Sequence, residues 1–220
     1  MKTEKLFNLS ETIAGEFLKD FEHPWEALPK IKDFILELGS SLDVNKFDKV
    51  SDDVWIAKSA RVFPSAYIAG PAIIDEDAEI RHSAFIRGGV IVGKGAVVGN
   101  STEMKNSIIF NRVQIPHYNY VGDSILGHRA HLGAGAITSN VKSDKTPVTV
   151  NYKGEKVATG LKKFGAMVGD FVEVGCNSVL CPGTVVGRNT TIYPLSRVRG
   201  YIECDSIFKD SKNIVKKQEG

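Results

Sequence analysis

A large aliphatic residue recurs at every sixth position through the middle of this 220-residue chain. Four residues after each of them stands a small or β-branched residue, such as Ala60 or Ala66. Neither the 3.6-residue period of a helix nor the two-residue period of a strand gives a strict six, whereas a hexapeptide solenoid does. The unbroken series is Ile56, Val62, Ile68, Ile74, Ile80, Ile86, Val92, Val98 and Met104.

Each hexad predicts one short strand and a corner, and three hexads close a triangular coil around the inward-pointing aliphatic residues. The register of this period slips by one residue at Ile109 and again at Leu126. The period itself ends after Leu132 and resumes from Val168 to Val198. Twenty hexads counted in this way predict six to seven coils. We therefore predict an all-β solenoid, with its coil domain over residues 51–200.

Residues 1–50 lack the six-residue period, and we expect a small helical arm there. Ser10 is placed to cap a helix over Glu11–Phe21, and a second helix would start at Pro29 and end at Gly39. We expect the arm to pack on the first coil, because the terminal coil of a solenoid exposes unpaired strand edges. A specific docking arm for a partner is the alternative.

An insertion interrupts the solenoid at residues 139–167. Val148–Tyr152 and Glu155–Ala158 flank Lys153-Gly154, which predicts a β-hairpin with a two-residue turn. The insertion is either ornament or an active-site loop, and the second is favoured because solenoid insertions tend to lie on the binding face. The period fades after Gly200, so residues 201–220 are assigned to a C-terminal tail, of which Lys209–Gly220 is expected to be polar and loose.

Composition excludes several classes of protein. The 28 Lys and Arg residues nearly balance the 26 Asp and Glu residues, so no general attraction to nucleic acid or membrane is expected. The chain starts without the apolar stretch of a signal peptide, and no segment approaches the length of a membrane span. Three cysteines, without metal-type spacing, favour reduced thiols in a cytoplasmic protein over a structural zinc site.

Two cations stand 18 residues, or one coil, apart. Arg87 and Lys105 each follow an aliphatic residue of the series, so they should stack on one face at the strand spacing of about 4.8 Å. Like charges side by side are unfavourable, and an anion such as phosphate between them would make the pair favourable. The alternative is that both side chains turn away into solvent.

His117 lies at a corner of the coil after Lys105. A lone histidine is more often structural, but this one lies a single coil from the cation pair. His82, two coils earlier, is too far away to share a metal with it, and His128 and His131 should not converge on one ion. A metal shared with a neighbouring subunit stays as an alternative. Asp123 either orients a histidine or accepts hydrogen bonds from the backbone N–H groups of a turn. The glycines of the GAGA segment at 133–136 either let a ligand approach the backbone closely or are needed only for tight corners.

The sequence resembles a known family in several segments. The segments are EMKNSI at 103–108, IPHYNYVGDSILG at 115–127, HLGAGAITSN at 131–140 and KFGAMVGD at 163–170. They resemble the acetyltransferase domain of the bifunctional glucosamine-1-phosphate acetyltransferase/N-acetylglucosamine-1-phosphate uridylyltransferase. The long hairpin is more similar to the archaeal sugar-phosphate nucleotidylyltransferase/acetyltransferases. The nucleotidyltransferase signature has no counterpart, so uridylyl transfer is not expected.

The resemblance implies a left-handed parallel β-helix assembled as a homotrimer, with acetyl-CoA in grooves between subunits. It implies that His117 is the general base and that Arg87 and Lys105 bind the sugar phosphate. Residues implied to line the amino-sugar and acetyl-donor site are Tyr120, Asn140 and Lys163, and those implied along the coenzyme A groove are Ala134 and Cys176. The family usually has serine in place of Cys176. His131 replaces a family asparagine that touches the sugar, which leaves the identity of the sugar open.

The leading hypothesis is an acetyl-CoA-dependent N-acetyltransferase acting on an amino-sugar 1-phosphate without a metal. His117 would accept the proton of the attacking amine, and a backbone N–H or Asn140 would stabilise the oxyanion. One alternative keeps the fold but acts on another amine or a hydroxyl. A catalytically silent trimeric scaffold and a solenoid carbonic anhydrase, which needs three convergent histidines, are the others.

Overall fold

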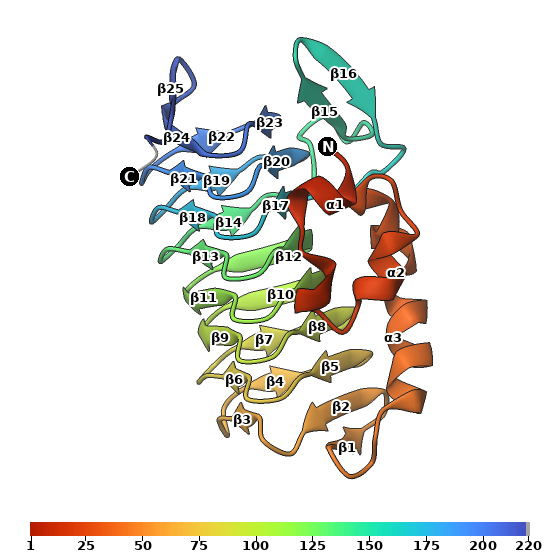
Figure 1. Cartoon of the computed structure of the whole chain (residues 1–220). Coiled ribbons are helices and arrows are strands. Elements are labelled where there is room, and N and C mark those ends of the chain that lie inside the picture. The colour runs from red at the N-terminus through yellow and green to blue at the C-terminus, as the bar shows by residue number, and fades with distance from the viewer. Residues whose placement is uncertain (219–220) are drawn as a thin grey trace.

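The computed structural model describes residues 1–218 and shows a triangular parallel β-helix flanked by a helical arm (Figure 1). The chain passes over three faces, here called A, B and C, in the same order in every coil. Face A contains β2 (Val54–Ala57), β5 (Ala72–Ile74), β8 (Val90–Val92), the second halves of β10 (Glu103–Ile109) and β12 (Tyr120–Leu126), β17 (Ala166–Val168), β20 (Thr184–Val186) and β23 (Tyr201–Ile202). Face B contains β3 (Arg61–Val62), β6 (Glu79–Ile80), β9 (Val97–Asn100), β11 (Gln114–His117), β13 (His131–Leu132), β18 (Glu173–Val174), β21 (Thr191–Ile192) and β24 (Ser206–Asp210). Face C contains β4 (Tyr67–Ile68), β7 (Phe85–Ile86), the first halves of β10 and β12, β14 (Ile137–Thr138), β19 (Val179–Leu180) and β22 (Arg197–Val198).

The predicted left-handed β-helix of hexapeptide repeats is confirmed, and the register of its strands follows the sequence slips. Met104 stacks on Val121, 17 residues later, where the earlier coils repeat every 18. The coil count is higher than predicted, because face B alone has eight parallel strands. Val186 pairs with Ile202 in a shortened 16-residue coil, which a strict six-residue count does not detect.

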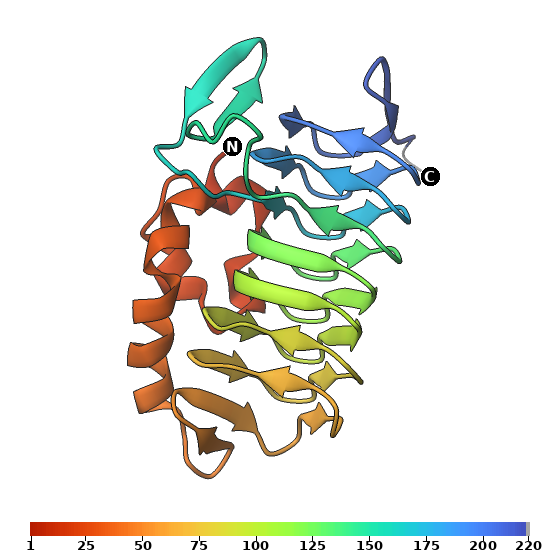
Figure 2. The same ribbon diagram turned by 180° about the vertical axis from the view of Figure 1, so that it is seen from behind.

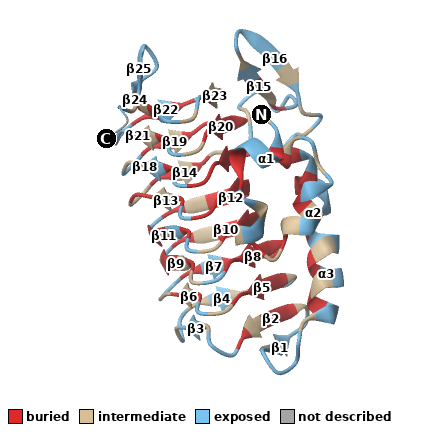
Figure 3. Cartoon of the chain, in the orientation of Figure 1, coloured by how far each residue is buried: buried red, intermediate tan, exposed pale blue. Residues whose placement is uncertain are grey.

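Face A is apolar on its outside as well as its inside. The residue before the inward-pointing one is large and apolar on every strand of this face, and neighbouring strands place these outward residues in one row. The row is Trp55, Ile73, Ile91, Ile108, Ile125, Met167, Val185 and Tyr201. Figure 3 shows the resulting buried strands next to the helices. Face A therefore needs a cover.

The N-terminal arm supplies most of that cover. It consists of α1 (Thr3–Leu6), η1 (Leu9–Glu11), α2 (Gly15–Lys19), η2 (Pro24–Lys30) and α3 (Ile31–Ser41). Figures 1 and 2 show it along one flank of the β-helix, and α3 contacts β5, β8 and β10. Ile31 and Ile35 of α3 are fully buried in this contact. The arm does reach the first coil, where Gly39 packs on Trp55 of β2, but it also runs over later coils, because the apolar surface that needs covering extends along face A.

Both predicted arm helices also differ from the structure. The first, expected over Glu11–Phe21, is two short elements, η1 and α2, with a turn between them. At the start of α2, Gly15 lies so close to the carbonyl of Leu9 that no Cβ would fit. The second continues through Gly39 to Ser41. A Cβ at Gly39 would lie 2.5 Å from the ring of Trp55, so this glycine allows close packing instead of ending the helix.

Short antiparallel strands close both ends of the β-helix. β1 (Phe47–Ser51) pairs with β2, and β25 (Asn213–Lys216) pairs with β24. The expected loose tail is therefore a hairpin as far as Lys216. The insertion forms the predicted hairpin from β15 (Thr149–Tyr152) and β16 (Glu155–Ala158), and Tyr152 packs on Tyr201 at the end of face A. Among residues 1–218 no helix is long and apolar enough to cross a membrane.

Candidate active site

Arg87 and Lys105 lie on consecutive coils at the corner between faces C and A. The backbone N–H of Arg87 donates to the carbonyl of Met104 at 2.8 Å, which fixes the predicted stacking. Each cation has a carboxylate partner that the stacking argument did not include. Arg87 Nη1 lies 2.7 Å from Glu103 Oε1, and Lys105 Nζ lies 3.5 Å from Asp123 Oδ2. These carboxylates hold the two side chains at the corner.

Asp123 is the centre of a polar network on the same corner. Its side chain is only 6% exposed, and it accepts hydrogen bonds from Asn106 Nδ2 at 2.9 Å and Asn140 Nδ2 at 2.5 Å. Neither predicted role of Asp123, orienting a histidine or accepting turn amides, matches these contacts. Asn106, Asp123 and Asn140 stand 17 residues apart, so the shortened coils stack them in one column. The network thus positions Lys105 and Asn140 together.

Tyr120 belongs to the same network. Asn140 Nδ2 donates to Tyr120 Oη at 3.2 Å. Burial, and then the charge of Asp123, raise the pKa of the Tyr120 hydroxyl above its ordinary value. The phenol therefore keeps its proton at neutral pH and can donate it in a hydrogen bond to an acceptor on a ligand.

Lys163 lies where the insertion returns to the coil. The next residue, Phe164, donates its backbone N–H to the carbonyl of Asn140 at 3.0 Å, and Gly165 donates to the carbonyl of Asp123 at 2.8 Å. These bonds place the exposed Lys163 beside Asn140. Five of the residues predicted from the sequence thus share one corner: Arg87, Lys105, Tyr120, Asn140 and Lys163.

Ala134 and Cys176, which were predicted to lie along the coenzyme groove, form one column with His117 at the corner between faces B and C. We call this column of three residues the His117 ladder. The carbonyl of His117 accepts from the N–H of Gly135 at 3.0 Å, and the carbonyl of Ala134 accepts from the N–H of Asn177 at 2.8 Å. His117, Ala134 and Cys176 therefore lie on three consecutive coils. The imidazole of His117 and the thiol of Cys176 are exposed.

Asn119 supports this ladder and is not among the residues predicted from the sequence. It is 2% exposed; its Oδ1 accepts from the N–H of His117 at 3.1 Å, and its Nδ2 donates to the carbonyls of Gly133 and Ala136 at 2.9 and 3.0 Å. A sequence signal exists, because Asn119 occupies the small-residue position of its hexad, four residues after Ile115. A buried amide at this position fixes the backbone of both coils.

Face C separates the two corners. Tyr120 starts its strand on this face only three residues after His117, or roughly 10 Å of extended chain. A ligand lying across face C would therefore reach the His117 ladder with one end and the Arg87–Lys105 corner with the other. One chain presents His117 and Lys163 at opposite edges of the same face.

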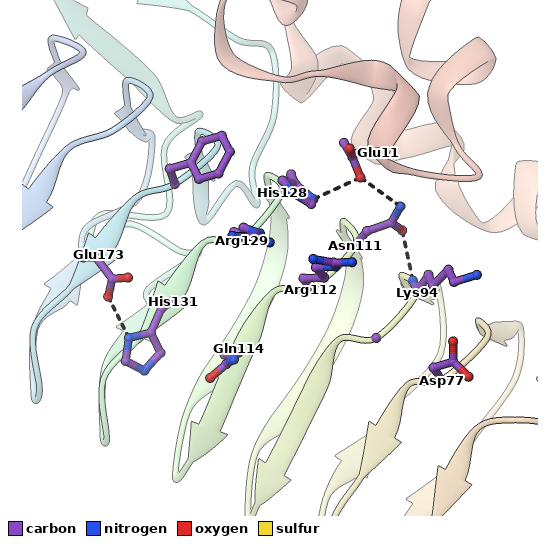
Figure 4. Close-up of a pocket in the computed structure, with 12 residues that line it drawn as sticks. Glu11, Asp77, Lys94, Asn111, Arg112, Gln114, His128, Arg129, His131 and Glu173 are labelled. Atoms are coloured by element: carbon purple, nitrogen blue, oxygen red, sulfur yellow. Dashed lines mark hydrogen bonds and ion pairs between the residues drawn. The ribbon is translucent and has the colours of Figure 1, made fainter.

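His131 lies apart from both corners. It begins β13 on face B, beside Gln114, and its Nδ1 lies 2.8 Å from Glu173 Oε2. It lines a hollow of about 970 Å³ at the corner between faces A and B (Figure 4). His128 lines the same hollow and faces Glu11 at 3.2 Å, so the two histidines do not converge. Within residues 1–218 no three His, Cys, Asp or Glu side chains are grouped to hold a metal ion.

Comparison with known proteins gives several relatives. A family model described as the GMPPB C-terminal domain matches residues 68–160. The "Bifunctional protein GlmU" of Methanococcus maripaludis is 34% identical over 205 residues, which cover 92% of this chain and 50% of the relative. The "Bifunctional sugar-1-phosphate nucleotidylyltransferase/acetyltransferase" of Sulfurisphaera tokodaii is 36% identical, with 76% and 46% covered. The chain thus spans half or less of the length of these relatives.

Two solved acyltransferase structures also match, with weak similarity. The polySia-specific acetyltransferase NeuO has a TM-score of 0.45 at 13% identity, with 76% of this chain and 88% of that chain covered. The UDP-N-acetylglucosamine O-acyltransferase LpxA of Moraxella catarrhalis has a TM-score of 0.41 at 11% identity, with 74% and 72% covered. Similarity at this level carries no argument about the site.

A shorter relative matches over most of its length. The "Uncharacterized acetyltransferase YaiX" of Escherichia coli is 32% identical over 185 residues, which cover 78% of this chain and 80% of the relative. Together with the hexapeptide coils, the sequence matches show that the chain belongs to the hexapeptide-repeat acetyltransferases and is related to the acetyltransferase part of the GlmU proteins.

Proposed function

We propose that this acetyltransferase transfers the acetyl group of acetyl-CoA to the amine of an amino-sugar 1-phosphate. The observation that carries the proposal is face C itself, with the Arg87–Lys105 corner at one edge and the His117 ladder at the other. Arg87, Lys105 and Lys163 supply cations for a phosphate, and Tyr120 and Asn140 supply hydrogen-bond donors for a sugar. Binding the phosphate at its own corner would fix the distance from the amine to the base, which is the positional part of catalysis.

The reaction needs one proton acceptor and one leaving group. The amine nitrogen attacks the thioester carbonyl carbon, the C–S bond breaks, and coenzyme A leaves as a thiolate that is then protonated. His117 accepts the proton that the amine loses, a role worth roughly 10²–10⁴-fold in rate. Its exposed imidazole and the backbone fixed by Asn119 suit this role. Ala134 and Cys176, on the next two coils, would lie along the coenzyme.

We extend the proposal to a homotrimer. His131 lies around the corner from face C, so in a single chain it cannot approach a sugar held at face C. A neighbouring chain whose face B packs against face C would bring its His131 to that sugar. Active sites between subunits would also shield the thioester, which an open prism face leaves in water.

The test is thiol release from acetyl-CoA with a panel of acceptors. We expect glucosamine 1-phosphate or an epimer to react, and the matching unphosphorylated amino sugar to react at least tenfold more slowly in kcat/KM. Arg87→Ala and Lys105→Ala should raise KM for the phosphorylated acceptor and leave KM for acetyl-CoA nearly unchanged. Lys94→Ala, which removes a cation paired with Glu76 at another corner, is the matched control. Equal activity with and without the phosphate would reject the phosphate-binding role.

One observation favours a second candidate acceptor. His131, in place of the family asparagine, lies within hydrogen-bond distance of Glu173, so the ring that it presents to a ligand differs in shape and hydrogen bonding from an amide. Another amine or a hydroxyl on a different sugar is therefore included in the acceptor panel. Turnover of such an acceptor in preference to the amino-sugar 1-phosphates would select this alternative. Failure to bind acetyl-CoA at all would instead support a non-catalytic scaffold.

A further inference from the structure

The arm and the β-helix together enclose a pocket of about 460 Å³ beside the Arg87–Lys105 corner. Its lining comes from both parts of the chain: Leu28, Pro29 and Lys32 from the arm, and Arg87, Gly88, Lys105 and Asn106 from the coils. Lys32 lies in the first turn of α3. The arm, which covers face A, thus also brings a further cation, Lys32, to the predicted phosphate corner.

The charge balance of the corner makes this cation important. Arg87 is paired with Glu103, and Lys105 is paired with Asp123, so the four side chains carry two positive and two negative charges. These two ion pairs therefore contribute no net charge to the corner. Among residues 1–218 no carboxylate lies within ion-pair distance of Lys32, which lines the same pocket. The net positive charge that would attract a phosphate therefore comes from Lys32 of the arm together with the exposed Lys163 at the return of the insertion.

The arm is held firmly at this point. Asn106 Nδ2 donates to the carbonyl of Leu28 at 3.2 Å, and the same amide donates to Asp123. A Cβ built on Gly89 would lie 3.2 Å from Lys32 Cγ, so the stem of the lysine rests against the corner backbone. A short link thus joins Lys32 to the network that orients Lys105.

A second contact joins the arm to the return of the insertion. The buried Trp25 packs on Phe164, with ring centroids 5.7 Å apart, and Phe164 directly follows Lys163. The arm therefore contacts the coil next to both lysines of the predicted site. The arm therefore lies at the edge of face C that contains the predicted phosphate-binding residues, and not at the edge that contains the His117 ladder.

We propose that Lys32 binds the phosphate of the acceptor and makes the N-terminal arm part of the acceptor site. This rests on the proposed function, because it assigns one more ligand to the same phosphate. A charge-assisted hydrogen bond from Lys32 would form only with an anionic acceptor. The arm thereby contributes to the selection of phosphorylated over unphosphorylated sugars.

The test measures binding without turnover. Glucose 1-phosphate, which has the phosphate but no amine, is titrated calorimetrically into the full chain and its variants at two salt concentrations. Lys32→Ala should weaken binding about tenfold and reduce its salt dependence, whereas Lys32→Arg should stay within about threefold of the parent. Lys19→Ala, which removes an exposed arm cation paired with Glu16, is the matched control and should leave binding unchanged. Thermal unfolding of each variant checks that the arm remains packed.

The outcomes separate this proposal from the one on which it rests. Equal affinity of Lys32→Ala and the parent chain would overturn the role of Lys32 and leave the acetyltransferase proposal standing. Equal weakening by Lys19→Ala would also overturn it, because the effect would then be a general one of net charge. If the parent chain does not bind glucose 1-phosphate, both the phosphate corner and Lys32 are rejected. In steady-state assays Lys32→Ala should raise KM for the phosphorylated acceptor and not for acetyl-CoA.

Discussion

Lys105 and Asp123 face each other from consecutive coils, with Nζ and Oδ2 3.5 Å apart, and the side chain of Asp123 is almost completely buried. The carboxylate therefore serves two purposes. It holds an ammonium group toward the solvent at the predicted phosphate corner, and it accepts the hydrogen bonds of two asparagine side chains from neighbouring coils.

Asp123→Ala should destabilise the fold and weaken acceptor binding together. The substitution leaves the amides of Asn106 and Asn140 without their acceptor, which should lower the free energy of unfolding by about 2–4 kcal/mol. KM for the phosphorylated acceptor should rise while KM for acetyl-CoA stays the same. Denaturant unfolding and steady-state kinetics measure the two effects. Asp123→Asn, which keeps the shape and one acceptor oxygen, should recover part of the stability; if it behaves like alanine, the carboxylate charge is what matters.

His117→Ala should lower kcat by about 10²-fold or more, since a general base acts in the transition state. Binding of acetyl-CoA should change little. His82→Ala provides a matched control, because His82 is exposed at the same corner two coils earlier, with Asn100 between the two histidines. Near-normal turnover of the His117 variant, or an equal loss in the His82 variant, would remove His117 from the mechanism.

A trimer with shared sites predicts complementation between chains that are each impaired at a low acceptor concentration. His131 and Lys105 lie on different faces of one chain, so a shared site would take them from two chains. Mixing Lys105→Ala chains with His131→Ala chains should then restore part of the activity, because some mixed trimers contain one intact site. His117→Ala mixed with Lys163→Ala serves as the comparison, because both residues border face C, and it should restore little. A monomer in light scattering under assay conditions would contradict the shared site.

Stability should depend on pH through Asp170. This residue is 1% exposed, and burial raises the pKa of its carboxyl above the ordinary value, against hydrogen bonds from Asn8 and the charge of Arg188. Between the ordinary and the raised pKa, the folded protein keeps a proton that the unfolded chain has released. The contribution of Asp170 to stability therefore falls as pH rises through this window.

Asp170→Asn should remove that dependence. The free energy of unfolding of the parent chain, minus that of the variant, should fall as pH rises from the ordinary pKa of an aspartate toward the raised pKa of Asp170. Asp205→Asn is the control of opposite sign, because a hydrogen bond from Asn189 lowers the pKa of Asp205. The free energy of unfolding of the parent chain, minus that of Asp205→Asn, should rise with pH over the acid range. A flat difference for Asp170→Asn would show that its pKa is the same in both states.

The β-helix was predictable because its inward residues follow one strict period that no other structure imposes. The position of the arm depends on a second pattern. In every coil the residue before the inward-pointing residue of face A is apolar, as at Trp55, Ile73 and Ile91. That pattern is visible in the sequence, but it does not say which segment covers the row. The Asp123 network likewise follows from the 17-residue coils. Its hydrogen bonds could not be predicted, because they depend on the directions of the side chains. The position of Lys32 could not be predicted either, because it depends on packing between the arm and the coils, and the six-residue period does not extend into the arm.

The insertion leaves the coil and returns to it without changing the register. Ile125 pairs directly with Met167, so the coil closes as if the intervening residues were absent. A change in the length of this excursion costs mainly loop-closure entropy, about 0.6 kcal/mol for each doubling. The coils and the insertion are thus separable parts of the chain. We expect the insertion to tolerate shortening, lengthening or exchange while the stacked coils keep their spacing.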